Sequence, residues 1–207
     1  MGLINKDTFI CLDCETTGLD TSHDQIIEIA LVRFNFDGIL DSFETLIDPL
    51  VPIPEASMAI HHITDEMVRG KPKIQEVLPR IFEFIGRHII VGHAIPNDIA
   101  FICSAAKQHH VPCKLASHPY LDTLRMARMY GESPSNSLET LRHHFNISEE
   151  GAHRAMNDVI VNIEVFKYLC NNFKTTEQLV NRLKSPIQLK TMPLGKHKGR
   201  TFSEITV

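Results

Sequence analysis

The sequence predicts an α/β fold in which a mixed five-stranded sheet is flanked by helices. Two observations support this prediction. Three β-prone segments follow one another near the N-terminus, and helical periodicity then alternates with two short apolar segments. Antiparallel strands followed by alternating helices and strands are typical of a mixed sheet with helical layers. With 207 residues, 43% hydrophobic and 22% charged, the chain is long enough for one domain with a real core.

The strands are predicted from β-branched and apolar runs bounded by turn signals. Asp37-Gly38 is a strong hairpin signal between the second and third of them. The predicted strands are residues 8–15, 25–36, 39–47, 88–93 and 120–122.

The helices are predicted from apolar spacing and from start signals. Pro96 suits the first turn of a helix, and Thr175 with Gln178 has the spacing of a capping box. Pro186 ends the helix that this box opens. The predicted helices are residues 75–86, a segment that begins at Pro96, 123–129, 137–145, 155–172 and a short one from 175.

Charge divides the chain unevenly. The net charge is −4, but residues 184–207 carry five Lys or Arg and one acid, which leaves −8 on residues 1–183. We therefore predict a domain over residues 1–175 and a C-terminal extension with a basic tail over 176–207. The tail either contacts phosphates or is a solvated charge run. An acidic body is unusual for a plain DNA-binding module, but it makes sense if some acids hold divalent cations.

Cysteine usage and hydropathy bear on the compartment. The five cysteines are odd in number and scattered, which suits a reducing cytosol better than a disulfide framework. No apolar run approaches the ~18 residues of a membrane span, and the N-terminus lacks the apolar core of a signal peptide. We expect a cytoplasmic protein that does not bind membranes.

The stretch FICLDCETTG (9–18) offers both thiols and carboxylates for chemistry. In a strand, Cys11, Asp13 and Glu15 point one way, and Leu12 and Cys14 the other. The two thiols would therefore lie on opposite faces. A redox C-x-x-C normally opens a helix, and zinc needs further ligands at short spacing, so we interpret both cysteines as packing residues.

Asp13 and Glu15 alone form a weak motif, which a solvated pair of carboxylates would explain equally well. Two further acids change this interpretation. Asp98 lies just beyond the strand 88–93, and Asp158 lies among core positions of a helix, where an unpaired charge is costly. His153 precedes Asp158 by five residues, which would separate the side chains by about 140° on one helix. We therefore expect His153 in the loop that enters the helix.

Together these residues form three motifs in order. They are D-x-E-T-T-G (Asp13, Glu15), H-x4-D (His93, Asp98) and H-x4-D (His153, Asp158). The set resembles the DnaQ-like 3′–5′ exonucleases of the histidine-containing (DEDDh) branch, which includes the proofreading epsilon subunit of bacterial DNA polymerase III. The resemblance covers roughly residues 7–172 and implies an RNase H-like fold. The chain departs from the family's usual residues at Ala94, where asparagine is usual, at Asn97, where phenylalanine is usual, and at His62, where glycine is usual.

The resemblance implies a site that holds two Mg²⁺ or Mn²⁺ ions. Asp13 would bridge both ions, Glu15 and Asp158 would complete the first site, and Asp98 would hold the second. His153 would take the proton from the attacking water, and an imidazole suits this role at neutral pH. The alternative for His153 is an ordinary surface histidine.

The same resemblance implies contacts to the terminal nucleotide. Backbone groups of Thr16, Thr17 and Gly18 would grip it, and Leu19 would either wedge against the last base or simply pack. His61 and His93 would line the cleft, unless His93 is a buried residue at a strand end.

Three functions follow as alternatives. The first is release of nucleoside 5′-monophosphates from 3′ ends, with proofreading of DNA as a polymerase III epsilon-type subunit. Its partners would be a single-stranded 3′ end and a replicative polymerase subunit bound through the C-terminal extension. The second is trimming of RNA by a stand-alone exoribonuclease. The third is a non-catalytic scaffold that binds a polymerase or nucleic acid, although the intact set of five catalytic residues argues against it.

Overall fold

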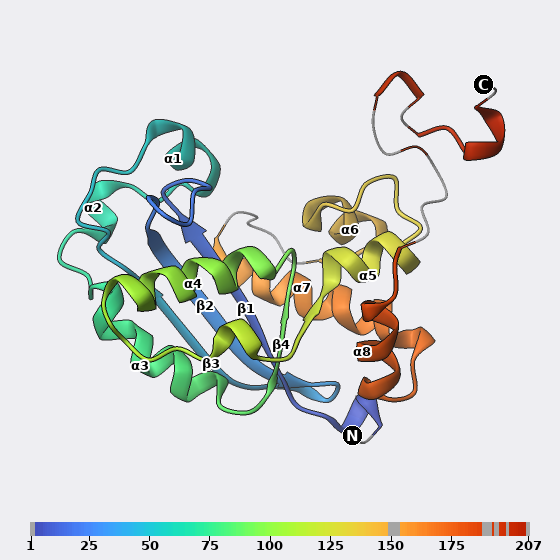
Figure 1. Ribbon diagram of the computed structural model, residues 1–207, viewed down its shortest axis with the longest axis horizontal. Coiled ribbons are helices and arrows are strands. Elements are labelled where there is room, and N and C mark those ends of the chain that lie inside the picture. Colours follow the sequence, from blue (N-terminus) through green and yellow to red (C-terminus); the bar gives the residue numbers. More distant parts are fainter. Residues whose placement is uncertain (1–2, 149–153, 188–191, 193–194, 198, 206–207) are drawn as a thin grey trace.

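A computed structural model describes residues 3–148, 154–187, 192, 195–197 and 199–205. A five-stranded sheet has the order β3-β2-β1-β4-β5, with β1, β2 and β3 antiparallel and with β4 and β5 parallel to β1. The mixed sheet is thus confirmed, and Figure 1 shows helices over both of its faces. The strands are β1 (Phe9–Thr16), β2 (Ile26–Asn35), β3 (Gly38–Leu46), β4 (Ile89–Gly92) and β5 (Tyr120–Asp122).

The longer helices begin and end within a few residues of their predicted bounds. They are α3 (Ile74–Ile85), α4 (Pro96–Gln108), α5 (Thr123–Tyr130), α6 (Leu138–His144), α7 (Ala155–Leu169) and α8 (Thr176–Lys184). The capping box that opens α8 is present, because the Thr175 side chain accepts from the Gln178 N–H and the Gln178 side chain accepts from the Thr175 N–H. Two short helices that periodicity missed are α1 (Glu55–His61) and α2 (Asp65–Val68).

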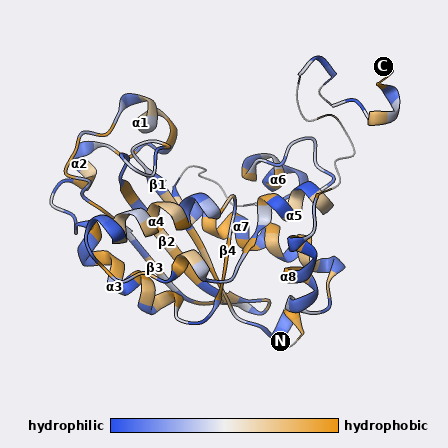
Figure 2. Cartoon of the chain, in the orientation of Figure 1, coloured by the Kyte–Doolittle hydropathy of each residue, from blue (hydrophilic) through white to orange (hydrophobic). Residues whose placement is uncertain are grey.

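Alternation along β1 gives the sheet two apolar faces. Phe9 and Cys11 pack in the cluster under α7, whereas Ile10 and Leu12 pack under α3 and α4. The α7 face is centred on the rings of Phe9, Phe34 and Phe166. The ring centroids of Phe166 and Phe9 lie 5.1 Å apart. Figure 2 shows apolar residues along the central strands.

The first part of the predicted C-terminal extension packs on the domain. Leu179 of α8 is fully buried in the cluster under α7, and the Ile4 N–H donates to the carbonyl of Lys174. Arg125 also donates hydrogen bonds of 2.7 Å to the carbonyls of Leu183 and Ser185. In contrast, residues 195–197 and 199–205 of the tail lie away from the body (Figure 1). Among the described residues, no helix has the length and apolar character needed to span a membrane.

Candidate active site

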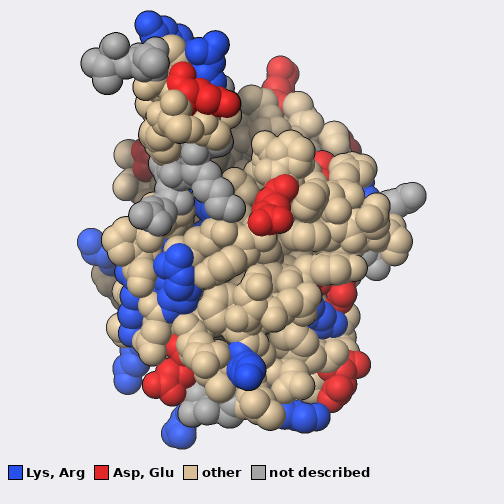
Figure 3. Space-filling model, turned by 90° about the vertical axis from the view of Figure 1, so that its right-hand side faces the viewer, with Lys and Arg blue, Asp and Glu red and all other residues tan. Residues whose placement is uncertain are grey.

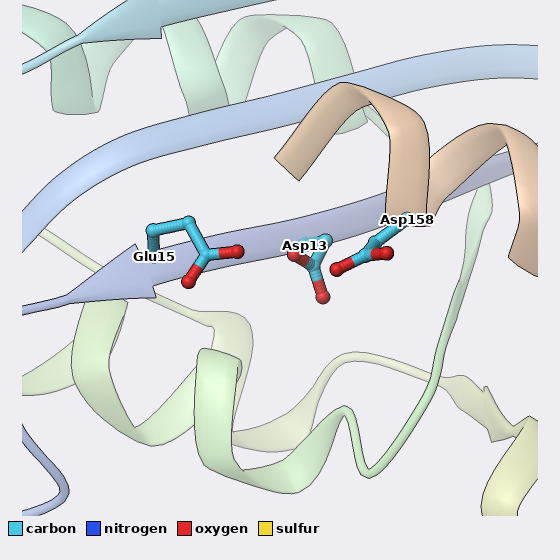
Figure 4. A group of neighbouring side chains, drawn as sticks. All are labelled: Asp13, Glu15 and Asp158. Atoms are coloured by element: carbon cyan, nitrogen blue, oxygen red, sulfur yellow. The ribbon is translucent and has the colours of Figure 1, made fainter. Parts of the chain in front are cut away.

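Three carboxylates meet where β1 reaches the N-terminal end of α7. Asp13, Glu15 and Asp158 each offer an oxygen, and these oxygens all lie within 4.8 Å of one another. Figure 4 shows Asp13 and Glu15 on the same side of β1, with Asp158 reaching them from α7. The strand alternation predicted for Asp13 and Glu15 is therefore confirmed.

Burial and mutual repulsion make this acidic group costly to ionise. The pKa of Asp13 is raised well above its ordinary value, first by burial and then by the charges of Asp98, Asp158 and Glu15. Burial, followed by the charge of Asp158, raises the pKa of Glu15 to about 8. A cation between the carboxylates would relieve this repulsion. Because all the donors are oxygens, the group fits a hard divalent cation such as Mg²⁺ or Mn²⁺.

Asp98 lies beside this group but is not one of its three members. It occupies the first turn of α4, and its Oδ1 accepts a 3.0 Å hydrogen bond from the Cys14 N–H. Burial raises its pKa to about 7. Its charge is the largest electrostatic contribution to the raised pKa of Asp13, so the structure brings all four predicted acids into one neighbourhood.

The two cysteines of the C-x-x-C spacing lie on opposite faces of the sheet. Cys11 is buried, and its thiol contacts the Val159 carbonyl and the Asn162 amide under α7. Cys14 packs against the cluster on the other face. Burial raises the pKa of both thiols, which keeps them protonated. The interpretation of both as packing residues is confirmed.

The turn after β1 is held by its own polar groups. The Thr17 N–H donates to the Gln25 carbonyl at 2.9 Å, and the Thr17 hydroxyl donates to Asp24 at 3.0 Å. The Thr16 hydroxyl donates to the Gly18 carbonyl. A Cβ at position 18 would collide with the Asp24 carboxylate, so a larger residue there would displace the acceptor of the Thr17 hydroxyl and the Asp20 N–H. The Thr17 N–H is therefore already occupied within the protein.

Leu19, which follows this turn, is 95% exposed. Leu19 therefore does not pack in the protein interior, which was one of the two roles expected for it. The Ser57 hydroxyl donates to the Thr17 carbonyl at 2.7 Å, which ties α1 to the same turn.

The histidines predicted near the site have different surroundings. His61 is 2% exposed, and its Nδ1 accepts from the Ile63 N–H. His93 is half-buried, and its two ring nitrogens lie 3.0 Å from the Thr123 hydroxyl and the Asn136 carbonyl. Burial lowers the pKa of both imidazoles. His153 lies outside the described residues.

Sequence reasoning missed an ion pair next to the acidic group. Glu28 on β2 lies directly opposite Glu15 on β1, and Arg154 forms a 2.6 Å ion pair with Glu28. The signal was available, since Glu28 is a single charge within the apolar strand segment IIEIALV. Its partner was not readable, because nothing in the sequence links these two positions.

Comparisons with known proteins agree with the geometry. The chain is 37% identical over 160 residues to the DNA polymerase III subunit epsilon of Aquifex aeolicus, covering 77% of this chain and 78% of that protein. It is 34% identical over 195 residues to the PolC-type DNA polymerase III of Clostridium perfringens, covering 91% of this chain but 13% of that protein. The chain thus spans only a small part of the PolC-type relatives that it matches.

Solved structures share the fold. Exonuclease X in complex with 5′ overhanging duplex DNA superposes with a TM-score of 0.67 and 26% identity, covering 84% of this chain and 99% of that one. Escherichia coli exonuclease I in complex with a dT13 oligonucleotide gives a TM-score of 0.71 at 21% identity, covering 80% of this chain and 41% of that one. The expected RNase H-like exonuclease fold is confirmed. A sequence model of the exonuclease family (RNase_T) matches residues 10–166, and the chain belongs to that family.

Proposed function

We propose that the chain is a metal-dependent 3′–5′ exonuclease that releases nucleoside 5′-monophosphates from nucleic-acid 3′ ends. The observation that carries this proposal is the acidic group of Asp13, Glu15 and Asp158, with Asp98 beside it. Membership of the exonuclease family supports it.

In this proposal the four acids would hold two Mg²⁺ or Mn²⁺ ions, and Asp13 would serve as a ligand of both. When bound, two such ions neutralise phosphate charge and stabilise the leaving oxygen. His153 accepts the proton of the attacking water, which a neutral imidazole does well near pH 7. The carboxylates must be ionised to bind cations, and their raised pKa values mean that cations compete with protons for these oxygens.

Substrate contacts are assigned to the surroundings of the β1 turn. Thr16, Thr17 and Gly18 would hold the terminal nucleotide through groups other than the occupied Thr17 N–H. The exposed Leu19 side chain would wedge against the last base, burying apolar surface only when substrate is bound. His61 and His93 would shape the cleft wall.

We infer that the substrate is a single-stranded 3′ end of DNA and that the role is proofreading beside a replicative polymerase. Kinship to an epsilon subunit and to PolC-type polymerases supports this inference. The polymerase would dock on the part of the C-terminal extension that follows α8, whose residues 195–197 and 199–205 lie away from the domain (Figure 1). The free thiols suit the reducing cytoplasm where replication would occur.

The test compares three substrates labelled for 3′ release: a DNA primer with a mismatched end, single-stranded DNA and a short RNA. We expect Mn²⁺- or Mg²⁺-dependent release of mononucleotides, fastest from DNA, and none from Asp13→Asn. Faster release from RNA would favour the trimming role instead. Binding without hydrolysis of any substrate would favour the scaffold and contradict the proposal.

A further inference from the structure

Glu28 is a buried charge whose hydrogen-bond partners, among the residues that the structure describes, all lie at the start of α7. Its side chain is 1% exposed on β2, with Ile27 and Ile29 as its neighbours along the strand. A buried carboxylate without partners would cost several kcal/mol. The Glu28 carboxylate therefore needs hydrogen-bond donors or a positive charge within contact distance. The residues that supply them are held in place by the cost of leaving the charge unpaired.

Two consecutive residues satisfy it. The Arg154 Nε lies 3.1 Å from each Glu28 oxygen, and the Arg154 Nη2 lies 2.6 Å from Oε1. The backbone N–H of Ala155 donates to Oε2 at 3.0 Å. Arg154 is the N-cap residue of α7 and Ala155 is its first residue. The Glu28 carboxylate on β2 thus binds the N-terminus of α7 through two donors, the Arg154 guanidinium and the Ala155 backbone N–H.

The contact of Glu28 with the start of α7 links Asp158 to Glu15, two members of the acidic group. The Asp158 N–H donates to the Arg154 carbonyl at 3.0 Å, so Asp158 lies one helical turn beyond Arg154. Glu15 is the cross-strand neighbour of Glu28. Glu28 therefore fixes where Asp158 on α7 lies relative to Glu15 on β1. Figure 4 shows the start of α7 running past β1 at this place.

We propose that Glu28 and Arg154 form a positioning pair that holds Asp158 against Asp13 and Glu15, and so sets cation affinity and turnover. The inference rests on the proposed function. Neither residue is placed against substrate; both act through Asp158. Outer partners of metal-binding carboxylates typically change metal affinity or activity by ~10–100-fold when altered.

The test uses variants that keep each charge but change its geometry, namely Arg154→Lys and Glu28→Asp. Lysine loses the planar fork, and aspartate is too short to reach both partners from the same backbone position. Binding of Mn²⁺ alone is measured by titration calorimetry, and kcat and KM are measured for a single-stranded DNA. We expect Mn²⁺ to bind ~10–100-fold more weakly, with kcat reduced at subsaturating metal and KM for DNA unchanged.

A matched control is available on α6. Arg142 holds Glu139 by the same two-pronged contact, with distances of 3.0 Å from Nε and 2.9 Å from Nη2. Arg142→Lys and Glu139→Asp should leave Mn²⁺ binding and kcat at wild-type values. The Arg154 side chain is 37% exposed, so Arg154→Lys carries the test even if Glu28→Asp does not fold.

Wild-type Mn²⁺ affinity in Arg154→Lys, with or without a lower melting temperature, would overturn the proposal, because the pair would then be purely structural. Tighter Mn²⁺ binding by Arg154→Gln, together with wild-type Mn²⁺ binding by Arg154→Lys, would also overturn the proposal. Mn²⁺ affinity would then depend on the charge at position 154 and not on the geometry of its contact with Glu28. Failure of the exonuclease proposal is distinguishable. In that case wild type binds Mn²⁺ and the variants bind it more weakly, but no protein releases mononucleotides.

Discussion

The backbone N–H of Cys14 donates a 3.0 Å hydrogen bond to the carboxylate of Asp98. Pairing with β4 covers β1 only from Phe9 to Cys11, since β4 ends at Gly92 and the chain turns into α4. Beyond Cys11 the strand β4 no longer offers backbone carbonyls to β1, and the Asp98 carboxylate accepts from the Cys14 N–H in their place. The same carboxylate is proposed to hold a cation, so it has a structural and a chemical role that mutation can separate.

Asp98→Asn should abolish hydrolysis with little loss of stability, because the amide oxygen still accepts the Cys14 N–H. Asp98→Ala should abolish hydrolysis and also lower the free energy of unfolding by ~1–3 kcal/mol, since it leaves that N–H without its partner. Urea denaturation of both variants, alongside an exonuclease assay, checks this difference. Equal stability of the two variants would mean that the hydrogen bond contributes nothing.

The acidic group should make the metal-free protein less stable at high pH. The pKa of Glu15 is about 8 when folded, against an ordinary value of 4.5, and that of Asp13 is also raised. The folded protein therefore holds protons that the unfolded chain has lost. The free energy of unfolding should fall as pH rises from about 4.5 to about 8. Urea denaturation in a chelator at about pH 5 and about pH 8 measures the fall, and Mg²⁺ should reduce it.

Asp13→Asn is the matched variant for this pH effect. It removes one ionisable member of the group, so it should be more stable than wild type at about pH 8 and should show a shallower pH dependence. A wild-type protein that gains stability between these two pH values would contradict the proposed repulsion.

His62→Gly should stabilise the fold. His62 is an exposed residue at the C-terminus of α1 with φ of 59°, in the left-handed region. That conformation costs a residue with a Cβ about 1–2 kcal/mol, and the larger unfolded-state entropy of glycine offsets part of the gain. We expect an increase of up to about 1 kcal/mol in the free energy of unfolding by urea denaturation. His62→Ala keeps the Cβ and the strain, so it should show no such gain.

Local patterns predicted most of the fold because they reflect local physics. Strand alternation fixed the common face of Asp13 and Glu15, and apolar runs located all five strands. The helices α1 and α2 were missed because they are short and are held by tertiary contacts, such as the Asp65 carboxylate accepting from the Ile53 N–H at 2.9 Å. The pairing of Glu28 with Arg154 joins distant parts of the chain, so periodicity carried no information about it.

His153→Ala should lower kcat by roughly 10²–10⁴, the usual effect of losing a positioned general base. The prediction rests on the H-x4-D motif, since His153 lies outside the described residues. The acid limb of the pH–rate profile should shift or disappear. Unchanged kcat near pH 7, measured at saturating Mg²⁺, would leave His153 as a surface residue.

Deleting residues 186–207 tests whether the basic tail holds the nucleic acid strand. Lys196 and Arg200 are exposed there, and Figure 3 shows Lys and Arg side chains gathered on the part that projects at the top. The deletion leaves Ser185, which accepts from Arg125, so α8 should stay in place and hydrolysis of a dinucleotide should be unchanged. Binding of a long single strand should weaken, and its log–log salt dependence should flatten by about 0.7 per lost phosphate contact. Lys196→Gln with Arg200→Gln should reproduce part of the change. Identical salt slopes for full-length and shortened chains would mean that the tail does not touch the strand.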